Sequence, residues 1–329
     1  MAFTAPGPLK LSPRLDAKPW GARSLEQFGF RLPPDEKIGE ALITASEAIV
    51  LNGPAACRTL GDIVSENPAR AIGELGLEVT HGLPLFPILI KLIDASENLS
   101  IQVHPTDAKA PSGSLGKTEA WHILDAHKGA RLFLGFKEGI TVNDIERVAR
   151  SGRSTAHLMR SVDAVPGMTV FLPAGTVHAL GAGVLIYEIQ QPSGITYRLD
   201  DWGRVDANGM GRELHIDQGI AVIDLDSRAV AIPPRPLPIS DGTRTELVRC
   251  SLFSAERITL PAGESVALDG GMAPQVFTVI AGSATMSADG EEVALAAGES
   301  AALLANSAES TLTSISDCVI LRGWLDQTA

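Results

Sequence analysis

The sequence predicts a mainly β protein built from antiparallel sandwiches or barrels. Short apolar runs alternate with turns rich in glycine and proline, as in residues 165–180, 183–199 and 274–305. The chain has 32 glycines and 21 prolines, and such evenly spaced short strands are typical of antiparallel sheets. The turn Pro-Ala-Gly occurs between strand-like runs at both 173–175 and 261–263. This weak internal similarity predicts two related β-domains.

Three segments show the apolar spacing of helices instead. Residues 58–73 are expected to be helical up to Pro68, because proline interrupts a helix beyond its first turn. Residues 141–162 predict a small helical insertion in the first domain, and 213–223 a further helix.

A proline-rich segment marks the expected domain boundary. Residues 231–244 begin with AIPPRPLPIS, which is unsuited to a central strand and is interpreted as a linker. Residues 1–230 would then form one domain and residues 245–329 a second β-domain. The second contains no histidine, so histidine-based chemistry is expected in the first.

Charge and composition exclude several function classes. With 27 basic and 39 acidic residues the formal net charge is −12, which disfavours nucleic acid and anionic membranes as partners. Apolar runs such as 83–93 are too short to span a bilayer, and the N-terminus lacks the pattern of a signal peptide. Cys57, Cys250 and Cys318 lie far apart, as expected of reduced thiols in a cytoplasmic protein.

Polar side chains occur on strands that otherwise look like core. Gln102 and His104 are two residues apart and point to the same side of a strand. Glu119 follows a turn and is expected to meet them from an adjacent strand, while His178 comes from a later strand. Two imidazoles, a carboxylate and an amide oxygen suit a zinc ion with an open position. The alternative is that these side chains are buried and hydrogen-bonded without a metal.

A second group of polar residues follows in 187–204. Glu188 and Gln190 share one face of a strand, and Thr196, Arg198 and Asp200 share a face after a Pro-Ser-Gly turn. A carboxylate and a guanidinium in a pocket suit proton abstraction beside a developing oxyanion. A structural arginine–carboxylate pair across the strands is the alternative.

Two lysines accompany these groups. Lys91 ends an apolar run, and Lys117 lies two residues before Glu119, so both are positioned for a phosphate. The alternative is that both extend to solvent.

Four ordered motifs carry a family resemblance: LSIQVHPTD (99–107), GKTEAWHILDA (116–126), LPAGTVHALGAG (172–183) and YEIQQPSGITYRLDDWGR (187–204). KPWGARSL (18–25) and GRELH (211–215) add to it. With these motifs the chain resembles the type I mannose-6-phosphate isomerase family in its short bacterial form.

The resemblance implies two cupin (jelly-roll) β-domains, the first catalytic and carrying a helical insertion. It implies one Zn²⁺ per chain, a sugar-phosphate substrate, and the following site residues: metal ligands Gln102, His104, Glu119 and His178; phosphate contacts Ser100, Lys91 and Lys117; and the active-site arginine Arg198.

The implied reaction interconverts mannose 6-phosphate and fructose 6-phosphate through a cis-enediol. Glu188 is the candidate base, and Arg198 would stabilise charge on the enediolate. Leu42 stands where the family usually has tryptophan, which leaves the preferred sugar open. Another sugar phosphate as substrate, or a non-catalytic regulatory cupin that binds sugar phosphates, are the alternatives.

Overall fold

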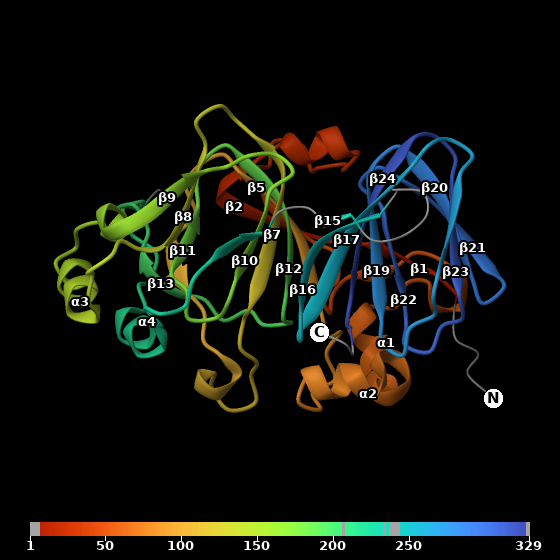
Figure 1. Cartoon of the computed structure of the whole chain (residues 1–329), viewed down its shortest axis with the longest axis horizontal. Helices are drawn as coiled ribbons and strands as arrows, with labels where there is room; N and C mark the ends of the chain where they lie inside the picture. The colour runs from red at the N-terminus through yellow and green to blue at the C-terminus, as the bar shows by residue number, and fades with distance from the viewer. Residues whose placement is uncertain (1–6, 206–207, 233–234, 237–243, 327–329) are drawn as a thin grey trace.

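The computed structural model describes residues 7–205, 208–232, 235–236 and 244–326. Its fold is mainly β, as the sequence predicts, and the described strands form four antiparallel sheets. The sheets follow one another as layers along the long axis of the molecule (Figure 1).

The first half of the chain supplies two facing sheets. The seven-stranded sheet has the order β14-β10-β7-β12-β5-β3-β2, with strand bounds Val230–Ile232, Thr169–Leu172, Glu119–Ala126, Val184–Gln190, Leu89–Ala95, Ile38–Leu42 and Arg14–Ala22. The five-stranded sheet has the order β13-β6-β11-β8-β9, with bounds Tyr197–Asp200, Ile101–Val103, His178–Leu180, Arg131–Phe136 and Met159–Asp163. Apolar side chains of both sheets, including Trp121, Ile123, Leu132 and Val170, fill the space between them.

The second half supplies the other two sheets. The eight-stranded sheet has the order β15-β16-β17-β24-β19-β22-β1-β4, with bounds Arg235–Pro236, Arg244–Cys250, Phe253–Leu260, Cys318–Trp324, Gln275–Ala281, Ser300–Leu303, Leu9–Ser12 and Ile49–Val50. The four-stranded sheet has the order β18-β23-β20-β21, with bounds Ser265–Leu268, Ser310–Ser314, Ser283–Ala288 and Glu291–Ala296. Because β1 and β4 belong to the eight-stranded sheet, the N-terminal segment ties the two halves together.

The seven-stranded sheet is buried on both faces. Ile90 and Tyr187 pack with side chains of the eight-stranded sheet such as Phe253. The alternate residues Lys91 and Glu188 point to the opposite side, where a pocket opens. Burial on both faces explains why these strands have long apolar sequences, and why their few charged residues are concentrated on one side.

Two helices lie beneath the junction of the halves (Figure 1), α1 (Leu60–Glu66) and α2 (Pro68–Val79). The helix expected over 58–73 does not simply end at Pro68. Pro68 is instead the first residue of α2. A backbone N–H at this position has no acceptor within the helix, so proline, which lacks the N–H, is tolerated there. The α2 backbone is kinked at Gly73, which has φ +70. A side chain at Gly73 would collide with the Met272 carbonyl oxygen, so glycine permits this close approach.

Helices α3 (Val142–Arg150) and α4 (Ile216–Val222) cover the outer face of the five-stranded sheet. The helix expected over 141–162 is shorter than predicted: after Gly152, which has a left-handed φ of +72, the chain forms a 3₁₀ turn and then β9. The described 3₁₀ turns are η1 (Ser24–Phe28), η2 (Gly53–Ala55), η3 (Asp107–Lys109) and η4 (Thr155–Leu158).

The chain crosses between the halves in the proline-rich segment. Residues 233–234 and 237–243 of the expected linker lie outside the described residues. Of the remainder, β14 is an edge strand of the seven-stranded sheet and β15 an edge strand of the eight-stranded sheet. The domain boundary itself stays a prediction.

Across the described ranges, none of the helices combines the length and the apolar character that crossing a membrane would require.

Candidate metal centre and pocket

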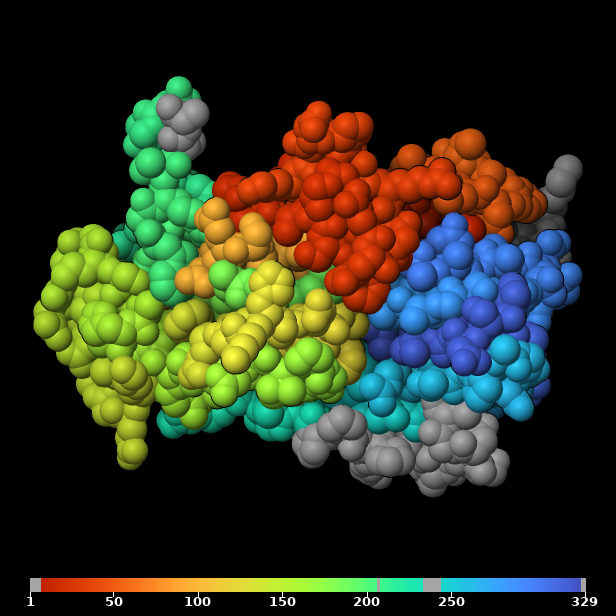
Figure 2. Space-filling view, turned by 90° about the horizontal axis from the view of Figure 1, so that it is seen from above, coloured from red at the N-terminus to blue at the C-terminus, as the bar shows by residue number. Residues whose placement is uncertain are grey.

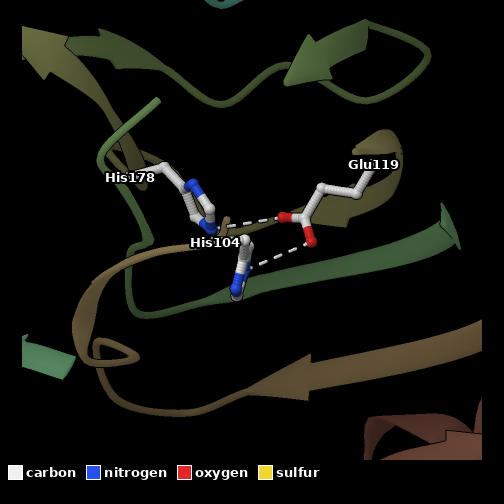
Figure 3. A group of neighbouring side chains, drawn as sticks. All are labelled: His104, Glu119 and His178. Carbon is white, nitrogen blue, oxygen red and sulfur yellow. Dashed lines mark ion pairs between the residues drawn. The ribbon is translucent and has the colours of Figure 1, made fainter. Parts of the chain in front are cut away.

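Three buried side chains converge between the two sheets of the first half (Figure 3). His104 follows β6, Glu119 begins β7 and His178 begins β11. The Nε2 atom of His104 lies 3.5 Å from Glu119 Oε2, and that of His178 lies 3.2 Å from Glu119 Oε1. One donor atom from each residue fits within a 4.8 Å group, which is a spacing that a single metal ion can bridge.

The sheets explain how these residues meet. His178 and Gln102 are direct partners in the β11–β6 ladder of the five-stranded sheet. Glu119 pairs with Leu172 in the seven-stranded sheet and therefore faces the histidines from across the sandwich. The expectation that Glu119 comes from an adjacent strand is wrong, because sequence spacing does not reveal which of two facing sheets a strand joins.

Backbone carbonyls fix the orientation of both imidazoles. The Nδ1 atom of His104 lies 2.7 Å from the carbonyl oxygen of Ile195, and that of His178 lies 2.9 Å from the carbonyl oxygen of Thr176. A carbonyl can only accept, so each Nδ1 carries the proton and each Nε2 lone pair is directed at Glu119. This is the arrangement commonly found around metal-binding histidines.

Burial and charge set the protonation states that a cation would need. Burial, followed by the charges of Lys117 and His178, lowers the pKa of His104 well below its usual value. Burial also lowers the pKa of His178. For Glu119, burial is the largest single effect and opposes ionisation, but the surrounding positive groups, Lys117 first among them, together outweigh it and lower the pKa of the carboxyl. Neutral imidazoles beside an ionised carboxylate are ready for a divalent metal.

Gln102 completes the group. Its Nε2 atom lies 3.5 Å from the Nε2 atoms of both His104 and His178, and its Oε1 accepts a hydrogen bond of 3.0 Å from the Ser100 hydroxyl. A half-turn of the amide would exchange the two atoms and direct the oxygen to the histidines. The Ser100 hydroxyl can serve either orientation, because it both donates and accepts.

Lys117 lies at the same place. Its Nζ is 2.9 Å from Glu119 Oε2 and 3.2 Å from His104 Nε2, and the residue is 5% exposed. The alternative that Lys117 extends to solvent is therefore wrong, because its position two residues before Glu119 turns it inward.

A row of paired residues leads from Leu42 across the seven-stranded sheet. Leu42 is the ladder partner of Lys91, Lys91 of Glu188, and Glu188 of Trp121. Lys91 Nζ lies 3.4 Å from Glu188 Oε1, and the indole of Trp121 donates a hydrogen bond of 2.9 Å to Glu188 Oε2. The Glu188 carboxylate is thus held from both sides.

A cavity of about 530 Å³ opens in front of these groups. It is lined by six of the nine predicted site residues, namely Lys91, Ser100, Gln102, Lys117, Glu188 and Arg198. The other three, His104, Glu119 and His178, are buried behind Gln102 and Lys117. Leu42 lines the same cavity, which suits a small ligand.

Thr196 and Arg198 also line the cavity, but Asp200 does not. The β13–β6 register shifts between Arg198 and Asp200, and Asp200 accepts a hydrogen bond of 2.7 Å from the backbone N–H of Thr155. The expectation that Thr196, Arg198 and Asp200 share one face therefore fails at Asp200, because a bulge breaks the alternation.

Several polar groups of the cavity were not predicted from the sequence, among them Trp121 and Arg212. Trp121 lies two residues after Glu119 on β7, so strand alternation would have placed it on the same face. Arg212 lies in an irregular segment where no periodicity gives the direction of a side chain. Its position in the cavity could not be predicted.

The chain is similar to known mannose-6-phosphate isomerases in sequence and in structure. Residues 9–131 match the family model described as "Phosphomannose isomerase type I, catalytic domain". The chain is 35% identical over 270 residues to the mannose-6-phosphate isomerase ManA of Bacillus subtilis, covering 79% of this chain and 81% of that protein. It is 31% identical over 295 residues to a mannose-6-phosphate isomerase of Streptococcus mutans, covering 88% and 89%.

Among solved structures, a mannose 6-phosphate isomerase from Bacillus subtilis superposes with a TM-score of 0.82 at 28% identity, covering 97% of this chain and 99% of that one. A putative mannosephosphate isomerase from Archaeoglobus fulgidus has a TM-score of 0.75 at 19% identity, covering 99% and 100%. At 19% identity, the similarity to the Archaeoglobus fulgidus protein shows only that the two chains share a fold.

Proposed function

Because this chain belongs to the type I phosphomannose isomerase family and is an isomerase, we propose that it interconverts mannose 6-phosphate and fructose 6-phosphate. The observation that carries the proposal is the buried His104–Glu119–His178 group behind a cavity lined by the other predicted site residues.

The side chains fit a metal ion. Oε2 of the fully buried Glu119 is paired with Lys117 Nζ at 2.9 Å, but Oε1 has no hydrogen-bond donor among the described residues and lies 3.2 Å from Nε2 of His178. A buried carboxylate facing two imidazole lone pairs is costly without a cation. We propose that His104, Glu119, His178 and Gln102 hold one Zn²⁺ per chain, since nitrogen and oxygen donors of this kind suit zinc. When bound, the ion would polarise the substrate carbonyl as a Lewis acid.

Glu188 is the proposed base. The isomerisation moves a proton between C2 and C1 of the sugar through a cis-enediol, so one group must remove the proton and return it. Oε2 of Glu188 is occupied by Trp121, but Oε1 accepts no hydrogen bond among the described residues. Lys91 Nζ forms an ion pair of 3.4 Å with Oε1 and so holds this oxygen at the cavity side of the sheet.

Cationic and hydroxyl groups around the cavity would hold the rest of the substrate. We propose that Arg198 stabilises negative charge on the enediolate oxygens, since it is the ladder partner of Gln102. Ser100, Lys91 and Lys117 line the same cavity and were expected at the phosphate. That role stays a prediction for all three residues. Lys91 and Lys117 are each paired with a carboxylate, which reduces the attraction that either lysine would have for a phosphate.

The finer organisation also remains proposed. We interpret each half as a cupin-type sandwich, supported by the paired sheets, with the division between 230 and 245. A cytoplasmic location is supported by the three unpaired cysteines, Cys57, Cys250 and Cys318.

A different sugar phosphate is the second candidate substrate. Leu42 is 5% exposed, lines the cavity and adjoins Lys91. A bulkier side chain at this position would reduce the space beside Lys91 and Glu188, so Leu42 affects which sugar fits.

A coupled assay for fructose 6-phosphate tests the proposal. The protein is assayed with mannose 6-phosphate after zinc loading and after chelation, with metal content measured in each sample. Zinc-dependent turnover supports the proposed reaction. Absent turnover in zinc-loaded protein would refute it, and a panel of aldose phosphates would then test the second candidate. Sugar-phosphate binding without turnover of any panel member would support the regulatory alternative.

A further inference from the structure

The cations that line the cavity differ in whether their charge is balanced. Six of them reach it: Arg14, Lys18, Lys91, Lys117, Arg198 and Arg212. Four are paired with neighbouring carboxylates. Arg14 pairs with Asp16 and Glu47, and Lys18 pairs with Asp16 and Glu40. Lys91 pairs with Glu188, and Lys117 pairs with Glu119. An anion entering the cavity would gain least from these four, because each charge is already compensated.

Arg198 has no such partner. No carboxylate of the described residues lies within 4.0 Å of its guanidinium. Its Nη1 donates to the carbonyl oxygen of Glu213 at 2.8 Å, and its buried Nε has no hydrogen-bond acceptor. Burial, and then the positive charge of Arg212, lowers the pKa of Arg198. Arginine nevertheless stays protonated in proteins, so Arg198 brings to the cavity a positive charge that no carboxylate of the described residues contacts directly.

Arg212 shares its only carboxylate among the described residues with a second arginine. Its Nε donates to Asp201 Oδ2 at 2.8 Å and its Nη2 donates to Asp201 Oδ1. Arg204 donates to the same Oδ1 at 2.6 Å. One buried carboxylate is therefore shared by two guanidiniums, and Arg204 has a second ion pair, 3.8 Å long, with the more exposed Glu97. Asp201 also fixes one edge of Arg212, which leaves Nη1 to donate to another acceptor.

The order of the strands indicates how far the segment that carries Arg212 lies from the strand of Gln102. Successive neighbours across the five-stranded sheet are His178, Gln102 and Arg198. The backbone N–H of His215 then donates to the Arg198 carbonyl at 2.7 Å, so the segment that carries Arg212 runs along the free edge of β13. Two strand spacings, roughly 10 Å, separate it from the strand of Gln102.

This segment belongs to a green projection that stands beside the red N-terminal segment in Figure 2. The N-terminal segment supplies Arg14 and Lys18 to the cavity wall, and the projection follows β13 in the chain. The segment of Arg212 thus lies beyond β6 and β13 from the strand of His178, along the five-stranded sheet.

We propose that Arg212, oriented by Asp201, binds the phosphate of the substrate. The inference rests on the proposed function, which places the reacting carbons at the metal centre. In a hexose 6-phosphate the phosphate is at the opposite end of the carbon chain from C1 and C2, as Arg212 is from His178. An arginine with one fixed edge presents the other edge to phosphate oxygens with little loss of entropy.

The test compares Arg212→Gln with the wild-type chain. The dissociation constant of inorganic phosphate is measured by calorimetric titration, and KM and kcat are measured with mannose 6-phosphate. Loss of a charge-assisted contact predicts an increase of about 10- to 100-fold in both the phosphate dissociation constant and KM. The change in kcat should be much smaller, because Arg212 is remote from the reacting carbons.

Arg14→Gln is the matched control, because Arg14 lines the same cavity but is already paired with Asp16 and Glu47. It should leave phosphate binding within about twofold of the wild type. Arg212→Lys keeps a cation beside Asp201 and should show a smaller defect than Arg212→Gln. Metal content and melting temperature identify a variant that fails to fold. If Arg212→Gln fails to fold, phosphate binding and KM are compared between Arg212→Lys and the wild type instead.

An unchanged phosphate dissociation constant in folded Arg212→Gln would overturn the inference, and so would an equal loss in Arg14→Gln. If the wild type does not turn over mannose 6-phosphate, the proposed function fails. Phosphate titration still tests Arg212 in that case, so the two failures can be distinguished.

Discussion

Trp121→Phe is the most informative single change, because it removes one hydrogen bond and keeps an aromatic ring. The indole N–H of Trp121 donates to Glu188 Oε2 at 2.9 Å, and both residues are only 3% exposed. The Trp121 ring also packs edge-on against His178, with 5.3 Å between ring centroids. Phenylalanine retains much of that packing but cannot orient the proposed base.

The size of the effect follows from the environment. A buried hydrogen bond to a carboxylate contributes about 1.5–3 kcal/mol. If most of it serves to orient Glu188 in the transition state, kcat should fall by about 10- to 100-fold. The carboxylate also loses a hydrogen-bond donor in the folded state, so the melting temperature should fall by several degrees. KM and zinc content should change little, because neither the cavity cations nor the ligands are altered.

Steady-state kinetics and metal analysis on the same samples check this prediction. Glu188→Gln is the comparison, since it removes the proposed base directly and should lower kcat further. Unchanged kcat in Trp121→Phe would refute the reasoning that the indole positions Glu188. A loss of zinc that parallels the loss of kcat would show instead that Trp121 acts through His178.

Three further predictions concern the metal centre, the pH dependence of stability and the second half of the chain. Glu119→Gln should lower zinc affinity by more than the 10- to 100-fold typical of changes around the ligands, measured by competition with a chelator, while the fold is retained. Burial lowers the pKa of His122 to about 4, so the unfolded chain, with its usual histidine pKa near 6.5, binds more protons below that pH. Folding should lose about 3 kcal/mol as the pH falls from 6.5 to 4 and nothing on this account above 6.5, and denaturant titrations should show the loss reduced in His122→Gln. Glu256 is fully buried and bonded to Arg244 at 2.8 Å and Arg322 at 2.9 Å, so Glu256→Gln should cost about 3–5 kcal/mol of unfolding free energy. An unchanged denaturation midpoint would show that the two arginines are satisfied without the carboxylate.

Strand alternation was the most reliable guide in the sequence. It correctly placed Gln102 on the side of His104 and Lys117 on the side of Glu119. It failed at Asp200, where a bulge breaks the period. The rule that proline interrupts a helix likewise misjudged Pro68, which begins one. Both errors are local irregularities that a regular period cannot represent.

The sequence by itself determined the kinds of groups in the site and the mainly β class of the fold. Side chains such as His104, Glu119 and His178 would be too costly in a strand core without a partner, so their presence there already indicated a shared site. Periodicity along one strand indicates which residues share a face of that strand. It does not indicate which other strand that face packs against.

Only the tertiary structure decided which sheet faces which, and hence what each charge contacts. Glu119 reaches the histidines from the opposite sheet, and Lys91 and Lys117 are each paired with a carboxylate. Arg212 enters the cavity from an irregular segment bonded to the edge of β13. These contacts depend on distances between residues far apart in the chain, which are fixed by the packing of whole sheets and not by any local pattern.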